Sequence, residues 1–425
     1  MLLASEILHS ITANIGIVSQ QSYISSLSYT LGHFTRSSIL QTMDDITQYT
    51  APLRWQGGEP LVGPLLAMIG DVEVVGLGEP THGDSQSLRL KRAIVREMSA
   101  MPGRMLVAWE RGVGHIELVN RFLGERGGLP REEVRLVYPW VYEEVQDLFG
   151  WLGAVASERD VMLRGVDMDG PPPERVLDEL RRRAGMPLST ALATVQELAA
   201  ESKDHRVSAA RWSAMAKTVS SVILREQAIS PADQLLVRTI QQWGEYERLK
   251  AISATDPAPW EYRDRCLAEN LAAQQAITKP NRVAFWAHNG HVSKWSARAG
   301  GHLAGAHNYR AIGVAFGAGS FHAWEPGDRA IHTRRLRPAT AQLPPPDSIE
   351  ALLQRAGVGD CFIDLRAMRN GENPLLQPLA IREVGLAADT SQFTTPKPIT
   401  EIFDVLVWIR EVTPAGIIRD HGATW

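Results

Sequence analysis

A carboxylate and an imidazole, Glu79 and His82, stand three residues apart, just after a short apolar run, Val72–Val75, and a glycine turn, Gly76–Gly78. A neighbouring carboxylate can fix the tautomer of a histidine and raise its basicity, which suits a general base. The two glycines free the backbone for a tight turn, and the proline that follows biases Glu79 toward an extended conformation. The pattern predicts a general-base pair at the end of a strand, just before a helix.

Three more apolar runs end in residues of the same types. Glu110 follows Met105–Trp109, Asp167 follows Val161–Val166, and His288 and His291 follow Arg282–Ala287. Parallel strands place their carboxyl ends at one edge of a sheet, which is where ligands bind in open α/β sheets. We therefore expect these side chains to meet in one crevice.

The pair His288 and His291 fits two kinds of chemistry. The histidines could donate hydrogen bonds to a carbonyl oxygen as it becomes negatively charged. They could also bind a divalent metal together with carboxylates, since histidine and carboxylate suit zinc. If a metal is present, its predicted ligands are His82, His288, Glu79 and Glu110. The spacing matches no standard helix-borne zinc motif, so no metal or other cofactor is expected.

Three other kinds of site are disfavoured by the sequence. The chain contains no Gly-x-Ser-x-Gly nucleophile elbow of a serine hydrolase. The Gly76–Gly78 turn lacks the third glycine of a dinucleotide fingerprint, and Glu79 would repel a pyrophosphate. The two cysteines, Cys266 and Cys361, are too few for a disulfide framework and have no neighbour that would activate a thiol.

The composition is that of a soluble globular protein. The 425 residues are 44% hydrophobic and 22% charged, with a formal net charge of -4, so no basic face for nucleic acid is expected. No apolar run reaches the roughly 18 residues that span a membrane. The first residues lack the positive charge of a signal peptide, so a cytoplasmic protein without a membrane partner is expected.

Strands alternate with helices over most of the chain, which indicates a mainly parallel sheet covered by helices. Helices are predicted at 85–98, 115–123, 143–156 and 349–356, and further strands at 309–316, 361–365 and 405–410. A loop is expected at 288–291, a glycine-rich segment follows the strand at 317–320, and a proline-bearing loop is expected at 338–346. Residues 174–278 are poor in glycine and proline and predict three to five helices. The predicted fold is α/β, with a mainly parallel central sheet flanked by helices and a helical subdomain at about 171–278 covering the cleft at the carboxyl ends. Residues 1–45 are predicted to be a peripheral or poorly ordered leader, and 46–425 a catalytic domain.

Several of these segments together resemble the erythromycin esterase family, in order and rough spacing, over residues 55–410. The resemblance lies in Gly76-Leu-Gly-Glu-Pro-Thr-His-Gly83, Arg89-Leu-Lys91, 140–152, 165–169, Arg263-Asp-Arg-Cys-Leu-Ala-Glu-Asn-Leu271, Phe285-Trp-Ala-His-Asn-Gly-His-Val-Ser-Lys294 and Ile363-Asp-Leu-Arg366. It implies a hydrolase that opens a macrolactone by adding water to its ester without a covalent serine. It also implies a role in antibiotic resistance or natural-product biosynthesis. The segment 84–88 departs from the family pattern, so erythromycin itself is not implied as the substrate.

The resemblance also implies roles for the site residues. His82 is expected to be the base that activates water, oriented by Glu79. An arginine placed at Arg263 joins His288 and His291 as stabilisers of the oxyanion, and Glu110 orients one of them or protonates the leaving alcohol. The expected partner is a small-molecule ester or macrocycle. Candidate aromatic walls for such a cleft are Trp109, Trp140, Trp260, Trp286 and Trp324.

Three alternatives stay open at this point. The same residues could serve a metal-dependent hydrolase, or a biosynthetic enzyme of the same family that catalyses lactonisation, rearrangement or elimination. A non-catalytic binding protein on the same scaffold is disfavoured, because every expected position is filled by a chemically competent residue.

Overall fold

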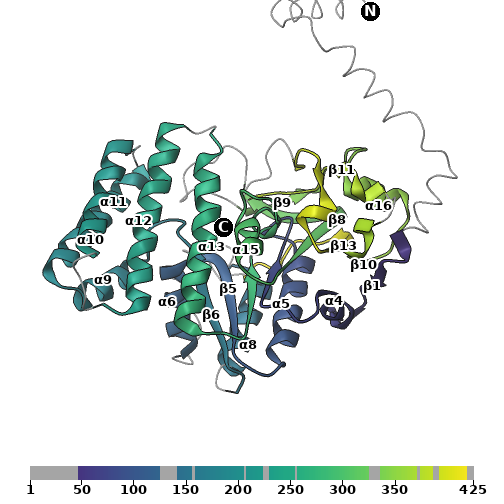
Figure 1. Cartoon of the computed structure of the whole chain (residues 1–425), viewed down its shortest axis with the longest axis horizontal. Coiled ribbons are helices and arrows are strands. Elements are labelled where there is room, and N and C mark those ends of the chain that lie inside the picture. Colours follow the sequence, from purple (N-terminus) through teal and green to yellow (C-terminus); the bar gives the residue numbers. More distant parts are fainter. Residues whose placement is uncertain are drawn as a thin grey trace, which may run out of the picture.

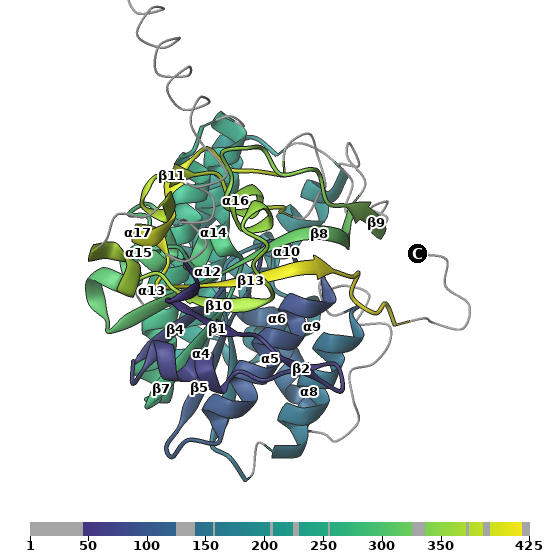
Figure 2. The same cartoon turned by 90° about the vertical axis from the view of Figure 1, so that its right-hand side faces the viewer.

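The computed structural model describes residues 46–124, 141–155, 158–204, 207–223, 229–253, 256–324, 336–370, 374–385 and 392–418. The predicted leader at 1–45 and Trp140 lie outside the described residues. Within them, the chain folds around a mostly parallel sheet with helices on both faces (Figures 1 and 2). This confirms the predicted fold class.

The central sheet has nine strands, and its order is β1-β10-β13-β8-β4-β7-β5-β6, with β9 paired to β8. The strands are β1 (Thr50–Pro52), β10 (Cys361–Asp364), β13 (Val405–Val412), β8 (Tyr309–Trp324), β4 (Val74–Leu77), β7 (Arg282–Trp286), β5 (Met105–Gly112), β6 (Val161–Asp167) and β9 (Leu336–Thr340). Neighbours from β13 to β6 are parallel. The pairings of β1, β10 and β9 are antiparallel. The four strands predicted to end in polar residues, β4, β7, β5 and β6, are therefore consecutive in the sheet.

The near-continuous apolar character of the central strands is explained by burial on both faces. Val75, Leu77 and Val107 contribute to the core on one side of the sheet. Val74 and Leu106 contribute to the core on the other side, as the two-residue period of a strand requires. Burying each such side chain contributes about 1.5–3 kcal/mol.

Helices cover both faces of the sheet. One core includes residues of α4 (Gly63–Ile69), α5 (Ser85–Ser99), α6 (Val113–Gly124) and α8 (Glu143–Val155). The other includes residues of α13 (Ala258–Thr278), α14 (Asn289–Val292), α15 (Ala299–Ala306), α16 (Ile349–Arg355) and α17 (Ile399–Ile402). Helix α5 begins at the predicted place because Asp84 caps it and accepts a hydrogen bond of 2.7 Å from Ser87 N–H.

The region predicted to be helical forms α9 (Glu174–Arg183), α10 (Met186–Asp204), α11 (Ala209–Ile223), α12 (Pro231–Ile252) and α13. Helices α9 to α12 have a hydrophobic core of their own, which also takes residues from α6. Trp212 and Trp243 meet edge to face in that core, with 4.8 Å between ring centroids. Figure 1 shows these helices beside α13, on the β6 side of the sheet. The proposed subdomain boundaries stay a prediction.

Three segments differ from the sequence predictions. The strand expected at 309–316 continues to Trp324, because β8 bends at Gly319 (φ 109°) and passes from pairing with β13 to pairing with β9. The proline-bearing loop expected at 338–346 begins as β9, at the edge of the sheet where proline is tolerated. The loop expected at 288–291 is a single helical turn, α14, capped by His288.

The remaining described elements are short. They are the hairpin β2 (Trp55–Gln56) and β3 (Glu59–Pro60), the pair β11 (Pro378–Leu379) and β12 (Lys397–Pro398), and the 3-10 turns η1 (Ala367–Asn370) and η2 (Pro374–Leu376). Over the described ranges, the helices fall short of the length and apolarity that crossing a membrane requires.

Candidate active site

Four consecutive strands bring the predicted site residues to one edge of the sheet. Glu79 and His82 follow β4, His288 follows β7, Glu110 lies near the end of β5, and Asp167 ends β6. Arg263 and His291 reach the same place from α13 and α14. Glu79 contacts His82, and Glu110 contacts Arg263, His291 and the backbone of His288. The two groups meet where the rings of His82 and His288 lie 5.3 Å apart between centroids.

Asn289 ties the two central strand ends together. Its backbone N–H donates to Glu79 O at 2.8 Å, and its side chain donates to Val314 O at 2.7 Å and accepts from Val314 N–H at 3.1 Å. Gly78 makes this contact possible, because a Cβ there would lie 2.3 Å from the Asn289 side-chain oxygen. The glycine after β4 is therefore needed for close approach.

The first part of the site, the Glu79–His82 corner, also contains Lys91. Glu79 Oε1 lies 2.7 Å from His82 Nδ1, and Glu79 Oε2 lies 2.8 Å from Lys91 Nζ. Lys91 is 1% exposed, donates to Ala287 O at 3.1 Å, and lies 4.6 Å from the centroid of the Trp286 ring. A lysine on α5 thus balances the charge of the carboxylate that contacts His82.

The charge on Glu79 determines which tautomer His82 adopts. Burial raises the pKa of Glu79, but Lys91 and His82 outweigh burial and hold the pKa below its ordinary value. The ionised carboxylate can only accept, so His82 Nδ1–H must donate the hydrogen bond. In the neutral ring Nε2 then carries the lone pair, which is the form that a general base requires.

The second part, the Arg263 cluster, consists of Glu110, Asp167, Arg263, Asp264 and His291. Arg263 donates to both oxygens of Asp167 through Nε at 3.2 Å, and to Glu110 Oε1 through Nη2 at 2.9 Å. Glu110 Oε2 accepts from the backbone N–H of His288 at 2.7 Å. Glu110 is therefore fixed by a side chain of α13 and by the backbone that follows β7.

His291 is held between two carboxylates. Its Nδ1 lies 2.7 Å from Asp264 Oδ1, and its Nε2 lies 3.1 Å from Glu110 Oε1. Burial lowers the pKa of His291, but Glu110 and Asp264 outweigh burial and raise the pKa to about 10. Asp264 is itself held by Arg298 Nη1 at 3.0 Å and by the Ala299 N–H at 3.0 Å. The two carboxylates thus favour the protonated form of His291, against the Arg263 guanidinium, whose Nη1 lies 3.0 Å from the same Nε2.

His288 has the opposite character. Its Nε2 lies 3.1 Å from Pro80 O and 3.2 Å from Val384 O, and its Nδ1 accepts from Gly290 N–H at 3.3 Å. Carbonyls only accept, so Nε2 carries the proton and the ring is neutral. Burial first, and then the nearby His82, lower the pKa of His288 to about 4. The predicted role of His288 as an oxyanion donor stays a prediction, and it would require Nε2–H to leave these carbonyls.

The structure places further charged residues at the site that sequence reasoning left without a role. Lys91 and Asp264 were inside the family-like motifs, but nothing in their spacing marked them as partners of Glu79 and His291. Glu383 lies beside the turn of α14, where a Cβ on Gly290 would be 3.5 Å from Glu383 Oε2. Burial raises the pKa of Glu383 above its ordinary value.

The aromatic residues proposed as cleft walls have different positions. Trp109 and Trp286 are each 2% exposed and stack on one another at 4.6 Å, so they form core rather than a wall. Trp260 is 49% exposed and meets Tyr246 edge to face at 6.0 Å. Both cysteines are buried and free, and burial raises the pKa of each thiol to about 12.

The predicted metal ligands are bound to protein groups in this structure. Glu79 contacts Lys91 and His82, Glu110 contacts Arg263 and His291, and His288 contacts backbone groups. Across the described part of the chain, no three or more His, Cys, Asp or Glu side chains are grouped as a metal ion would need. The metal-dependent alternative stays a prediction for this site.

Comparison with solved structures supports the fold. A succinoglycan biosynthesis protein is 19% identical, with a TM-score of 0.73 over 90% of this chain and 100% of its own. A protein from Bacillus cereus is 21% identical, with a TM-score of 0.71 over 90% of this chain and 99% of its own. A mutant of the erythromycin esterase EreC in its open conformation is 15% identical, with a TM-score of 0.67 over 87% of this chain and 100% of its own.

Among curated proteins, no significant match was found. The family model described as erythromycin esterase matches residues 103–412, which include Glu110, Arg263, His288 and His291. The match covers well over half of the chain and supports an esterase-like hydrolase. The chain belongs to the erythromycin esterase family.

Proposed function

We propose that this protein hydrolyses an ester or macrolactone with water activated by His82 and without a covalent serine intermediate. The observation that carries the proposal is the contrast between two histidines at one strand edge. His82 contacts one carboxylate, which is itself paired with Lys91, whereas His291 lies between two carboxylates. The first arrangement suits a base and the second suits a fixed cation.

The proposed reaction has two steps. His82 Nε2 takes a proton from water while the water oxygen forms a bond to the ester carbonyl carbon. The negative charge that develops on the carbonyl oxygen is stabilised by Arg263 and His291, which are cations held in place before the reaction begins. The bond to the alkoxide then breaks, and the alkoxide receives the proton that His82 carries.

Glu110 is assigned the orienting role of the two considered for it. Burial raises its pKa, but His291 and Arg263 outweigh burial and hold the pKa of Glu110 well below its ordinary value. An ionised carboxylate has no proton for a leaving alcohol. It can, however, hold Arg263 and His291 in position, as its contacts with both of them indicate.

The test of this function is the fate of water oxygen. The protein is incubated with a panel of aryl esters and macrolactones in ¹⁸O-labelled water, and the products are analysed by mass spectrometry. Hydrolysis places one label in a new carboxylate. A product without label, formed by lactonisation, rearrangement or elimination, would contradict hydrolysis and favour a biosynthetic reaction on the same scaffold.

The metal-dependent alternative is tested separately. Protein purified without added ions is assayed for bound metal and for activity before and after treatment with a chelator. We expect activity to survive chelation, because the four candidate ligands already have protein partners. Loss of activity that returns with added Zn²⁺ would contradict the metal-free mechanism.

A further inference from the structure

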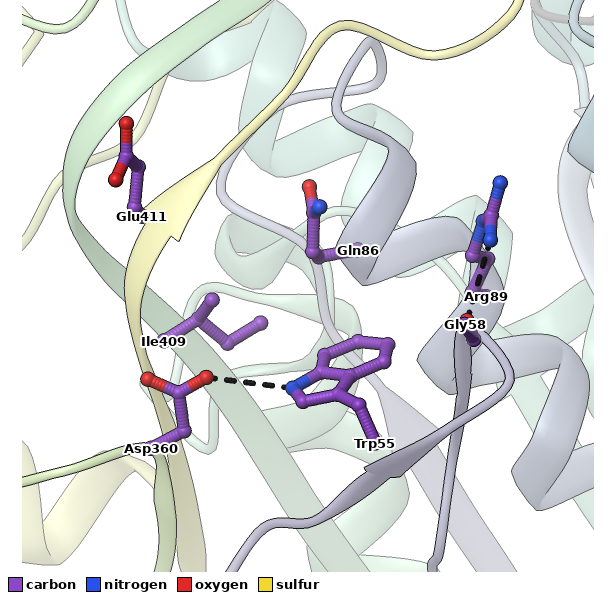
Figure 3. Close-up of a pocket in the computed structure, with 7 residues that line it drawn as sticks. All are labelled: Trp55, Gly58, Gln86, Arg89, Asp360, Ile409 and Glu411. Atoms are coloured by element: carbon purple, nitrogen blue, oxygen red, sulfur yellow. Dashed lines mark hydrogen bonds between the residues drawn. The ribbon is translucent and has the colours of Figure 1, made fainter.

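A second candidate binding site lies away from the charged cluster, in a cavity of about 320 Å³. Its walls come from four places in the chain: the β2–β3 hairpin, the first turns of α5, the residue before β10, and the end of β13. Figure 3 shows Ile409 to the left of the Trp55 ring, Arg89 to its right and Gln86 above it. The volume is at the lower end of the range for small-molecule pockets.

One wall of the cavity is a flat aromatic ring held in a defined orientation. Trp55 Nε1–H donates to Asp360 Oδ2 at 3.3 Å. Asp360 Oδ1 accepts from the backbone N–H of Arg410 at 3.0 Å and from its Nε at 3.1 Å. Ile409 lies behind the lining of the cavity and is itself fully buried. The ring is thus positioned before any ligand binds.

The opposite side of the cavity carries polar groups that are also anchored. Gln86 Oε1 accepts from Thr413 N–H at 2.8 Å, and Gln86 Nε2 donates to Thr413 Oγ1 at 3.1 Å. Arg89 Nη1 donates to Gly58 O at 3.2 Å. Gly58 (φ 83°) is needed there, because a Cβ would lie 2.8 Å from Arg89 Nη1. The anchored amide and guanidinium each have more N–H groups than these bonds use.

The mixture of groups selects a class of ligand. Asp360 and Glu411 add two carboxylates to the lining, and these would repel a phosphate. The guanidinium of Arg89 would repel a small cation. A purely apolar ligand would bury these polar groups without hydrogen bonds. A sugar ring has an apolar C–H face that suits the negative face of an indole, and hydroxyls that both donate and accept.

We propose that the cavity lined by Trp55, Gln86, Arg89, Asp360 and Glu411 binds one neutral pyranose unit, either as a free sugar or as part of a larger glycoside. The C–H face of the sugar lies against Trp55, and its hydroxyls bond to the amide, guanidinium and carboxylate groups. The site does not depend on the hydrolytic mechanism, because none of these side chains belongs to the Glu79–His82 corner or the Arg263 cluster.

The test is saturation-transfer NMR on the full-length protein with the methyl glycosides of glucose, galactose and mannose, each at about 10 mM, a concentration that detects millimolar affinity. A free sugar and a glycan are distinguished by repeating the measurement with a trisaccharide of the best monosaccharide. We expect transfer to the ring C–H protons of at least one glycoside. Choline and methyl phosphate, whose methyl protons the experiment detects, are the comparison probes and are expected to give no binding.

The Trp55→Ala variant is expected to lose about 10-fold or more in affinity, the scale of one aromatic stacking contact. Trp295→Ala, which removes a 42% exposed tryptophan outside the cavity, is the matched control and is expected to bind normally. If Trp55→Ala fails to fold, Glu411→Ala is measured in its place. This variant removes one carboxylate from the cavity lining and is expected to bind the glycoside more weakly. Absence of transfer to all three glycosides, transfer only to choline or methyl phosphate, or unchanged glycoside binding in the folded variants overturns the proposal.

Discussion

The Glu79–His82 corner and the Arg263 cluster lie at the same edge of the sheet, but they surround their histidines with different charged groups. In the corner, one carboxylate contacts His82, and Lys91 contacts that carboxylate from its other side. In the cluster, two carboxylates contact His291, and its pKa rises to about 10. The carboxylates that contact each imidazole, and the cations that contact each carboxylate, therefore give the two histidines different electrostatic surroundings.

The largest expected effect is at the corner. His82→Ala should lower kcat by about 10²–10⁴-fold, because the base that activates water is removed. The measurement is ester turnover at saturating substrate. His307→Ala is a matched control, since His307 also pairs with a glutamate, Glu73, at 3.0 Å but at a partly exposed position elsewhere. Near-normal turnover in His82→Ala would contradict the assignment of the base.

The next largest effect is expected when Lys91, the cation that contacts Glu79, is replaced. Lys91→Met leaves Glu79 buried without the cation that lowers its pKa, so the pKa of Glu79 should rise. The acidic limb of the kcat/KM profile should move to higher pH, while Lys91→Arg should restore it in part. A purely structural role would lower the amount of folded protein without moving the limb, and circular dichroism reports on that outcome.

The smallest effect at neutral pH is expected in the cluster. Asp264→Asn removes one of the two carboxylates that raise the pKa of His291, so the imidazolium should lose its proton below pH 10. The alkaline limb of kcat/KM should move to lower pH. At pH 7, where His291 remains charged, kcat/KM should change by less than about twofold. Asp160→Asn, at an exposed carboxylate paired with Arg104, is the matched control.

The stability of the folded protein should also depend on the protonation of His291. The folded pKa of His291 is raised from 6.5 to about 10, so its contribution is fully present below pH 6.5 and is lost as pH rises through 10. Urea unfolding between pH 6 and 10 should show a smaller alkaline loss in His291→Gln than in the unmodified protein. An identical pH dependence in both proteins would contradict the imidazolium assignment.

Much of the site could be predicted because its residues follow recognisable strands. Glu79, Glu110 and His288 each come after an apolar run, and parallel pairing forces the ends of such runs to one edge. The helix after Glu79 was also predictable, because Asp84 is a good capping residue. The extension of β8 was not predicted, because the glycine-rich segment at 317–320 was interpreted as following the strand, although β8 continues through Gly319 (φ 109°).

The sequence by itself determined which residue types reach the carboxyl ends of the strands, because strand period and glycine turns are local properties of the chain. Only the tertiary structure decided their charge states. His288 and His291 are three residues apart, yet one faces two backbone carbonyls and the other faces two carboxylates. A pKa depends on burial and on charges within a few ångströms, and these come from α5, α13 and β5, which are far apart in the sequence. The same reason applies to the Trp55 cavity, whose walls meet only in the folded protein.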